Sequence, residues 1–344
     1  MERTINRRRL VQVAAVGAGL LMARPVVAQD EIIIGLVTKT DTNPFFVKMK
    51  EGFEQEAKKS GAKTMTAAGK FDGDNASQVT AIENMVTAGA KGILITPSDT
   101  KAIVPTIEKA RDAGVLVIAL DTPTQPESAV DALFATDNFK AGVLIGQYAR
   151  AAMGDKEARI AMLDLAPGIS VGVLRHNGFV AGFTNDTSII GTPAPMQEDT
   201  TYLMDDRIVA SADTRGDQSE GQTGMENCLQ RDPDINLVYT INEPAALGAY
   251  TAIKNAGKEN DVMIVSIDGG RAGVEAVKDG KLAATSQQYP LKMASMGVQA
   301  VMNYVNTGEK PSGYVDTGVT LITDNPQEGV PSKDTTYGLE NAWG

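Results

Sequence analysis

The feature of this sequence that most constrains its fold is a repeated alternation between apolar runs and segments of helical periodicity. The first apolar run, Ile32-Ile33-Ile34-Gly35-Leu36-Val37, is mostly β-branched and is typical of a strand covered on both faces. Between residues 44 and 59, apolar side chains recur every three or four positions, which predicts a helix ending near Gly61. A strand followed directly by a helix is the repeating unit of an α/β fold.

The alternation continues in two series, and the second series begins after residue 137. Repeated β-α-β units predict parallel sheets with helices on both faces, so we expect an α/β fold of two doubly wound parallel-sheet lobes. Residues 185–216 are rich in Asp, Thr, Pro and Gly, which predicts a long surface connection with one short strand near residues 207–211. Further strands are expected at residues 92–96, 115–120, 159–165, 237–240, 262–267 and 282–286, and helices at 76–88, 100–113, 139–153, 170–184, 218–230, 244–256, 271–279 and 290–306.

The first residues have the pattern of a bacterial export signal. Arginines cluster before residue 10, an apolar run covers residues 10–22, and the small-residue sequence Val26-Val27-Ala28 follows. The apolar run is shorter than the roughly 20 residues that span a bilayer, which argues against a permanent anchor. We therefore expect a signal peptide at residues 1–28, cleaved near Ala28, and a periplasmic protein. The cluster Arg7-Arg8-Arg9-Leu10 leaves both the Sec and the twin-arginine (Tat) route open.

Composition excludes several classes of function. The chain has 32 Lys and Arg against 43 Asp and Glu, a net charge of -11, which argues against a nucleic-acid partner. It has one Cys and one His, so neither an intrachain disulfide nor a zinc site built on these residues is expected. No glycine-rich phosphate loop follows the first strand. We expect no cofactor and no metal, although an all-oxygen calcium or magnesium site is not excluded by composition.

Ligands of open α/β sheets bind beyond the carboxyl ends of the strands, so the residues after each strand are the place to search for function. The polar side chains there include planar carboxylate, amide and guanidinium groups and an amine, and two phenylalanines lie beside them in the sequence. Carboxylate, amide and guanidinium groups match adjacent hydroxyls, and an aromatic ring packs on the C–H face of a sugar. These positions are residues 39–43, Phe45, Phe46, 98–100, 121–122, 170–175, 242–243, Asp268 and 287–288, and they predict a polyhydroxylated ring as the ligand.

Asn43-Pro44-Phe45-Phe46, directly after the first strand, resembles the N-P-F-F element of ribose-type periplasmic binding proteins. Seven further elements resemble that family in the same order and extend the likeness over nearly all of residues 30–325. Within the family, residues 41–50, 92–101, 240–244 and 315–321 are most similar to fructose-binding proteins of ABC importers. The seven elements are residues 95–99, 117–122, 135–138, 175–179, 242–249, 265–269 and 284–290.

The resemblance implies a type I periplasmic binding protein, in which two lobes close on a sugar like a Venus flytrap. The first lobe would comprise residues 29–136 plus 289–316 and the second residues 137–288 plus 317–344, with hinge crossings near residues 136, 288 and 317. The chain would be a monomer and not an enzyme. Its partners would be a monosaccharide, with fructose as first choice and then ribose or mannose, and the membrane permease subunits of an ABC importer.

The resemblance also implies roles for individual residues. Asn43 would hydrogen-bond sugar hydroxyls, Phe45 and Phe46 would lie at the ring face, and Asp121 would accept from a hydroxyl pair. Arg175 would donate to sugar oxygens, and Asn242, Asp268 and Gln288 would complete the polar ring. Two departures, Lys39 for a small residue and Thr122 for the Arg usual in ribose binders, favour a ketose or a polyol over ribose. No residue near 214–217 matches the aromatic residue of the family's second lobe.

Structural roles remain open for several of these residues. One of Phe45 and Phe46 would serve the core, and Lys39 would be a solvated surface lysine. Asn242 and Asp268 would cap the helices that follow them, and Asp121 would cap its loop. Arg175 would form a surface salt bridge. His176 is expected to be structural or to face solvent, and Cys228, within a helical pattern, to be a small buried apolar residue.

Other functions also remain open. Gly168-Ile169-Ser170-Val171-Gly172 matches the G-x-S-x-G motif of hydrolases, but the single histidine follows on the same helix, where it is badly placed to serve Ser170. Paired carboxylates for glycoside hydrolysis are compatible with the composition. A sugar-responsive repressor would need a DNA-binding segment where the export signal stands. A polyol ligand, or a role as sugar sensor for a chemoreceptor or sensor kinase, would use the same binding mechanism.

Overall fold

The computed structural model describes residues 31–190 and 201–344. The predicted signal peptide, residues 1–28, lies outside the described residues. One compact unit, Ile32–Gly344, contains every helix and strand described below. Within the described part of the chain, no helix has both the length and the apolar character needed to cross a bilayer.

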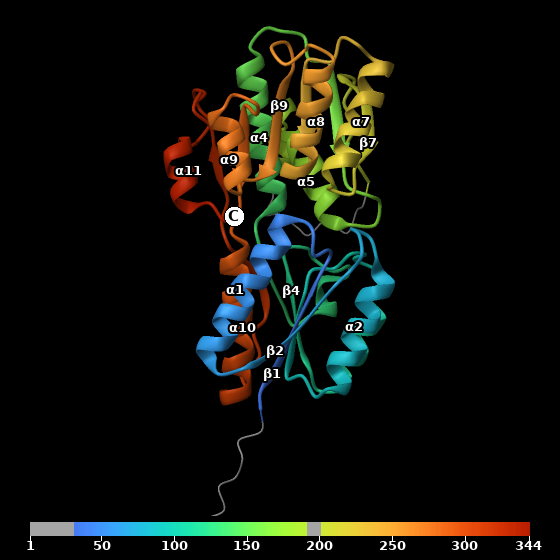
Figure 1. Ribbon diagram of the computed structural model, residues 1–344, viewed down its shortest axis with the longest axis vertical. Coiled ribbons are helices and arrows are strands. Elements are labelled where there is room, and N and C mark those ends of the chain that lie inside the picture. The colour runs from blue at the N-terminus through green and yellow to red at the C-terminus, as the bar shows by residue number, and fades with distance from the viewer. Residues whose placement is uncertain (1–30, 191–200) are drawn as a thin grey trace, which may run out of the picture. The chain divides into compact units, whose positions relative to one another are not determined.

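The first lobe is built on a six-stranded sheet with the strand order β11-β5-β4-β3-β1-β2. All five strand pairs are parallel. Helices α1 and α10 pack together on one face around Phe53 and Val298, whereas α2 and α3 cover the other face around Ile82 and Ile107 (Figure 1). The elements are β1 (Ile33–Thr38), α1 (Pro44–Ser60), β2 (Lys63–Ala68), α2 (Asn75–Thr87), β3 (Gly92–Ile95), α3 (Val104–Asp112), β4 (Leu116–Leu120), η1 (Glu127–Ala129), β5 (Ala132–Ala135), α10 (Pro290–Thr307) and β11 (Gly313–Asp316).

The second lobe repeats this design with the strand order β12-β10-β9-β8-β6-β7. Its strands are parallel except for β12, which runs antiparallel to β10. Helices α4 and α5 cover one face, and α7 and α8 cover the other. The elements are α4 (Asn138–Met153), β6 (Ile160–Asp164), α5 (Ser170–Thr184), α6 (Thr187–Ile190), β7 (Ile208–Asp213), α7 (Gln218–Arg231), β8 (Leu237–Thr240), α8 (Glu243–Asn255), β9 (Met263–Asp268), α9 (Arg271–Lys278), β10 (Ala284–Gln287), β12 (Thr320–Ile322) and α11 (Thr335–Asn341).

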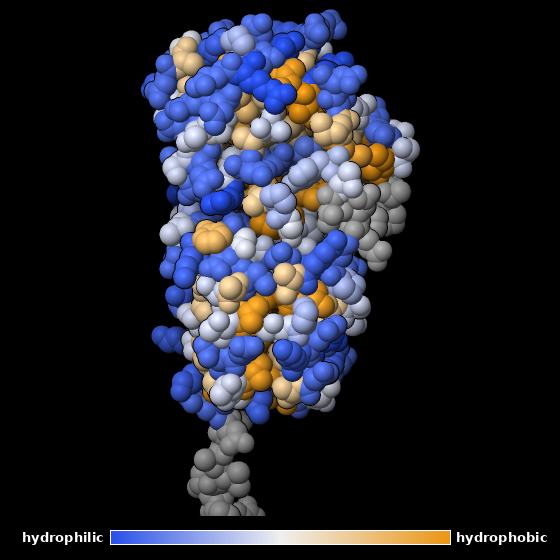
Figure 2. Space-filling model, turned by 90° about the vertical axis from the view of Figure 1, so that its right-hand side faces the viewer, coloured by the Kyte–Doolittle hydropathy of each residue, from blue (hydrophilic) through white to orange (hydrophobic). Residues whose placement is uncertain are grey.

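The chain passes between the two sheets three times, after β5, after β10 and after β11. After β5, helix α4 packs on β9 and β10 of the second sheet, and after β10, helix α10 packs on β3, β4 and β5 of the first. Two doubly wound parallel-sheet lobes, the fold class expected from the alternation, are therefore confirmed. On the face shown in Figure 2, hydrophilic residues are spread over both lobes and apolar residues form only small groups.

Several strands were not predicted, because they are short or partly exposed. Strand β2 is a partly exposed edge strand, and β5, β11 and β12 contain only three or four residues. Helix α3 begins at Val104 and not at residue 100, because Asp99 Oδ1 accepts hydrogen bonds from Lys101 N and Ala102 N and holds a turn there. Residues 185–216 contain the expected strand as β7 and also the short helix α6.

Helices α4 and α5 pack backbone against backbone through glycines. A Cβ atom on Gly146 of α4 would press into Phe179 O and lie 2.8 Å from Phe183 N of α5. A Cβ atom on Gly182 of α5 would in turn lie 3.0 Å from Gln147 N of α4. Because no side chain fits at these crossings, the glycines set the distance between the two helices. This fixes where the first half of α5, and with it Arg175, lies relative to the sheets.

We predict that Gly146→Ala destabilises the protein, although Gly to Ala normally gains about 1 kcal/mol inside a helix. The added methyl group has no space, and overpacking of this kind costs about 1–3 kcal/mol. Urea unfolding of the variant measures the change. Ala151→Ser, at an exposed position of the same helix, is the control and should change stability by less than about 0.5 kcal/mol. A stabilised Gly146→Ala variant would contradict the close crossing.

Candidate functional site

A small buried cavity lies where the carboxyl ends of strands from both sheets meet. Its volume is ≈ 20 Å³, which is room for about one water molecule. Nine of the ten residues proposed from the sequence line it, and the tenth, Thr122, instead donates a hydrogen bond of 2.8 Å to Asp121 Oδ2. The lining residues are Lys39, Asn43, Phe45, Phe46, Asp72, Asp121, Leu165, Val171, Arg175, Ile241, Asn242, Asp268 and Gln288.

Helix caps position the two asparagines of the cavity. Asn43 Oδ1 accepts from Phe45 N at 2.9 Å and begins helix α1. Asn242 Oδ1 accepts from Ala245 N at 3.1 Å and begins α8, while its Nδ2 donates to Gly216 O at 3.0 Å. Asn242 is therefore a capping residue, as the structural alternative proposed, and it also lines the cavity.

Asp268 does not cap helix α9, which corrects one of the structural alternatives. The N-cap of α9 is Gly270, which has no side-chain cap bond. Asp268 Oδ1 instead accepts from Gln288 Nε2 at 2.7 Å and from Arg175 Nη1 at 3.3 Å. The chain turns sharply after β9, with Asp268 at φ 117°, and this turn directs the carboxylate into the cavity and away from the helix end.

Arg175, near the start of α5, is the centre of the polar network. Its Nε donates to Asn138 Oδ1 at 2.8 Å and its Nη1 to Ile241 O at 2.9 Å. Its Nη2 lies 3.7 Å from Asp121 Oδ1, so the guanidinium of the second lobe faces a carboxylate at the end of β4 in the first. Arg175 is buried, and its planar fork is suited to hold several oxygens at once. The alternative of a surface salt bridge is wrong.

Several buried oxygen atoms at the cavity could accept hydrogen bonds that the described part of the protein does not supply. Asp72 Oδ1, Asp121 Oδ1 and Gln288 Oε1 are buried and accept no hydrogen bond from any described residue. An unsatisfied buried polar group costs about 1–3 kcal/mol, so a ligand that donates hydrogen bonds to these oxygens would remove that cost. Asp121 has φ 62°, and backbone strain of this kind is often found at binding sites.

Charges of both signs meet in the cavity. Burial raises the pKa of Asp268 to about 6, while the nearby Arg175 guanidinium opposes this change. Burial also raises the pKa of Asp72, and the charge of Lys39 opposes it. The Lys39 side chain is buried, with Nζ 5.8 Å from the centre of the Phe46 ring, so the solvated-surface alternative for Lys39 is wrong.

Asp72 was not found from the sequence. It follows β2, the edge strand that the apolar-run criterion missed, so the residues beyond its carboxyl end were not searched. The only available signal was its place between two glycines in the turn-rich sequence Gly69-Lys70-Phe71-Asp72-Gly73.

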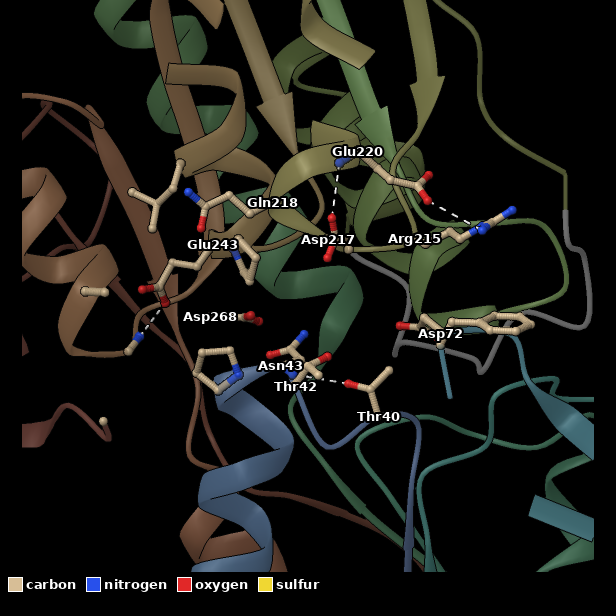
Figure 3. Close-up of a pocket in the computed structure, with 18 of the residues that line it drawn as sticks. Thr40, Thr42, Asn43, Asp72, Arg215, Asp217, Gln218, Glu220, Glu243 and Asp268 are labelled. Carbon is tan, nitrogen blue, oxygen red and sulfur yellow. Dashed lines mark hydrogen bonds and ion pairs between the residues drawn. The ribbon is translucent and has the colours of Figure 1, made fainter. Parts of the chain in front are cut away.

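A larger chamber opens beside the cavity and shares Asn43, Asp72 and Asp268 with it. Its volume is ≈ 670 Å³, within the usual range of small-molecule sites. Figure 3 shows Asn43 and Asp72 of the first lobe facing Asp268 and Arg215 of the second across it. At the position where no aromatic match was found, Arg215 lies 5.7 Å from the ring of Phe71 of the first lobe.

The hydrolase motif does not form a catalytic pair. Ser170 Oγ donates to Pro123 O at 3.0 Å. His176 Nδ1 lies 3.0 Å from Asp164 Oδ1, and its Nε2 lies 2.9 Å from Leu203 O, so both ring nitrogens are occupied. His176 is buried, which agrees with the expected structural role and contradicts the alternative that it faces solvent. Cys228 is also buried, and burial raises the pKa of its thiol to about 11, which leaves it unreactive at neutral pH.

Comparisons with family models and with known proteins indicate the same family. A model of the periplasmic binding protein domain matches residues 34–310. The chain is 33% identical over 297 residues to the ribose import binding protein RbsB of Bacillus subtilis, covering 86% of this chain and 88% of that protein. It is 32% identical over 321 residues to RbsB of Salmonella typhimurium, covering 92% and 99%.

Among solved structures, an ABC transporter periplasmic solute binding protein from Actinobacillus succinogenes with bound D-allose superposes with a TM-score of 0.73. It is 27% identical to this chain, and the match covers 85% of this chain and 98% of that protein.

We predict that His176 makes the stability of the protein depend on pH. Both of its neighbours, the Asp164 carboxylate and Leu203 O, accept hydrogen bonds, so the doubly protonated ring satisfies both. Burial lowers the pKa of His176, but the hydrogen bond to Asp164 and the charge of Asp164 outweigh burial and raise the pKa above its usual value. The stabilisation is thus complete below the unfolded pKa of about 6.5 and is lost as the pH rises through the higher folded pKa.

The measurement is the free energy of unfolding of the wild type and of His176→Gln between pH 5 and pH 9. The advantage of the wild type should shrink steadily with rising pH, because glutamine does not titrate. An advantage that stays constant over this range would show that the ring is not held in its charged form.

Proposed function

The chain belongs to the periplasmic binding protein family, and from this premise we propose that it captures a monosaccharide for an ABC importer. It would be a binding protein and not an enzyme, because the proteins that it resembles are binding proteins of importers. The observation that carries the proposal is the cavity around Arg175, in which hydrogen-bonding groups of both lobes converge on one point. Ribose import binding proteins, which the chain resembles over most of its length, support the same conclusion.

Binding would work by closure of the two lobes. Because the closed cavity has room for about one water molecule, a sugar ring enters only when the lobes move apart. Asn43, Phe45 and Asp121 would hold the sugar from the first lobe, and Arg175 and Asp268 would hold it from the second. A ligand that contacts both lobes binds the closed arrangement better than the open one and so shifts the population toward closure.

We propose the sugar from the resemblance and from the two departures at Lys39 and Thr122. Fructose is our first choice, on the resemblance of residues 41–50 and 92–101 to fructose-binding proteins, and ribose or mannose come next. The relatives named above bind ribose and the structural neighbour binds D-allose, so an aldose remains a direct competitor. Lys39 would donate to hydroxyls from inside the cavity, while Thr122 would act only by orienting Asp121. A sugar alcohol would bind by the same mechanism.

We further propose the setting in which this protein works. The lobes would be residues 29–136 plus 289–316 and residues 137–288 plus 317–344, with hinges at the three passages between the sheets. The protein would be a monomer in the periplasm after cleavage near Ala28, and the closed form would dock on the permease subunits. A chemoreceptor or sensor kinase would read the same closed form, so a sensing role is compatible with transport.

The proposal is tested by calorimetric titration with fructose, ribose, mannose, allose and sugar alcohols. The protein is first unfolded and refolded to remove any ligand that it carries from its source. We predict one-to-one binding of at least one of these ligands, and a loss of about 2–5 kcal/mol of binding free energy in Asp121→Ala and Arg175→Ala. Each change leaves buried polar partners unpaired after closure.

Asp112→Ala and Arg231→Ala are the matched controls, because they remove the same charges from exposed helix positions. Their affinity should equal that of the wild type. Unchanged affinity in Asp121→Ala and Arg175→Ala would place the ligand elsewhere, and no binding across the panel would refute the sugar-binding function.

A further inference from the structure

The segment from residue 335 to residue 344 is anchored on the second lobe. Its helix α11 packs against α9, as Figure 1 shows. Gln287 Nε2 donates to Gly338 O at 3.0 Å, and Arg271 N donates to Trp343 O at 2.8 Å. A Cβ atom on Gly338 would lie 2.9 Å from side-chain atoms of Ile322 and Val274, so this segment sits close against the lobe.

The side chain at the end of this segment enters the other lobe. Trp343 is buried, and its ring belongs to the apolar cluster of the first lobe that contains Phe45, Phe46 and Met293. The indole meets the Phe45 ring edge to face, with 5.5 Å between the ring centroids and 77° between the planes. Phe45 also contacts Phe46 edge to face at 5.3 Å, and both phenylalanines line the cavity. Trp343 is therefore the outer member of a row of three rings in edge-to-face contact.

The indole also contacts the opposite wall of the cavity. Its Nε1 donates to Gln288 O at 2.8 Å, and Gln288 Nε2 donates to Asp268 Oδ1 at 2.7 Å. A Cβ atom on Gly270 would lie 2.9 Å from the indole, so the turn that follows Asp268 rests directly on the ring. One side chain thus supports Phe45 of the first lobe and the backbone beside Asp268 and Gln288.

We propose that Trp343 is a positioning residue for ligand binding, and this inference rests on the proposed function. The indole spans the two lobes and holds the Phe45 ring at the face of the sugar. Without it, Phe45 loses one of its two edge-to-face partners and gains space to tilt away from the cavity. The backbone that carries Asp268 also loses its support. Residues 343 and 344 additionally line the larger chamber, so the indole forms part of the wall beside which the ligand enters.

The test compares Trp343→Ala and Trp343→Phe with Glu340→Ala, a control at an exposed position of the same segment. Binding is measured by calorimetry with the panel sugar that the wild type binds, at a temperature where melting curves show each protein folded. We expect Trp343→Ala to bind at least about tenfold more weakly, because the aromatic contact and the packing behind Phe45 are lost. Trp343→Phe keeps an aromatic edge, so its affinity should stay within about threefold of that of the wild type. The affinity of Glu340→Ala should equal that of the wild type.

A second readout uses the wild-type protein. Trp343 is the only tryptophan in the chain, so the tryptophan emission reports this position alone. We expect the emission to change on sugar addition and to saturate with the same Kd as the calorimetric titration. This measurement keeps the inference testable even when Trp343→Ala does not fold.

The outcomes separate the inference from the function on which it rests. A folded Trp343→Ala variant with wild-type affinity and only a lowered melting temperature would make Trp343 a structural residue and overturn the inference. Emission that stays constant while calorimetry detects binding would overturn it as well, and in both cases the sugar-binding function stands. A wild-type protein that binds no sugar of the panel overturns the proposed function, and this inference falls with it.

Discussion

The buried guanidinium of Arg175 is the interaction on which the rest of the site depends. A buried charge costs several kcal/mol unless its hydrogen bonds and counter-charges are supplied, and here four groups supply them. Asn138 Oδ1 and Ile241 O accept from it within 2.9 Å, and the carboxylates of Asp268 and Asp121 lie at 3.3 and 3.7 Å. These partners come from four separate segments, the start of α4 and the ends of β8, β9 and β4. The arginine therefore ties the two lobes to one point.

The fold brings these segments together through its connectivity. In each lobe the parallel strands end at the same edge, so the residues that follow them converge although they are far apart in the sequence. The close crossing of α4 and α5 through glycines then fixes the position from which the Arg175 side chain extends toward the cavity. Positive φ angles at Asp121 and Asp268 direct both carboxylates inward. The buried polar atoms that accept no hydrogen bond from the described residues, among them Asp121 Oδ1, are the groups a hydroxyl-rich ligand would satisfy.

The sequence was informative where local pattern decides structure. Continuous apolar runs predict strands buried on both faces, and β1, β4, β6 and β9 are such strands. Because site residues follow strands, searching after each strand led to ten proposed residues, nine of which line the cavity. It failed for Asp72, which follows an edge strand without an apolar run, and for Trp343. The place of Trp343 results from long-range packing of residues 335–344 across both lobes, which no local pattern encodes. The sequence also did not show that Asp268 fails to cap α9. This depends on the turn at Gly269 and Gly270, which makes Gly270 the N-cap.

The central claim is that a sugar bridges the two lobes around Arg175 and holds them closed. Small-angle X-ray scattering of the protein, with and without a saturating sugar, measures this movement directly. The account predicts a smaller radius of gyration in the presence of the sugar, with the change saturating at one sugar per protein. A bound sugar that leaves the radius of gyration unchanged would contradict closure as the binding mechanism.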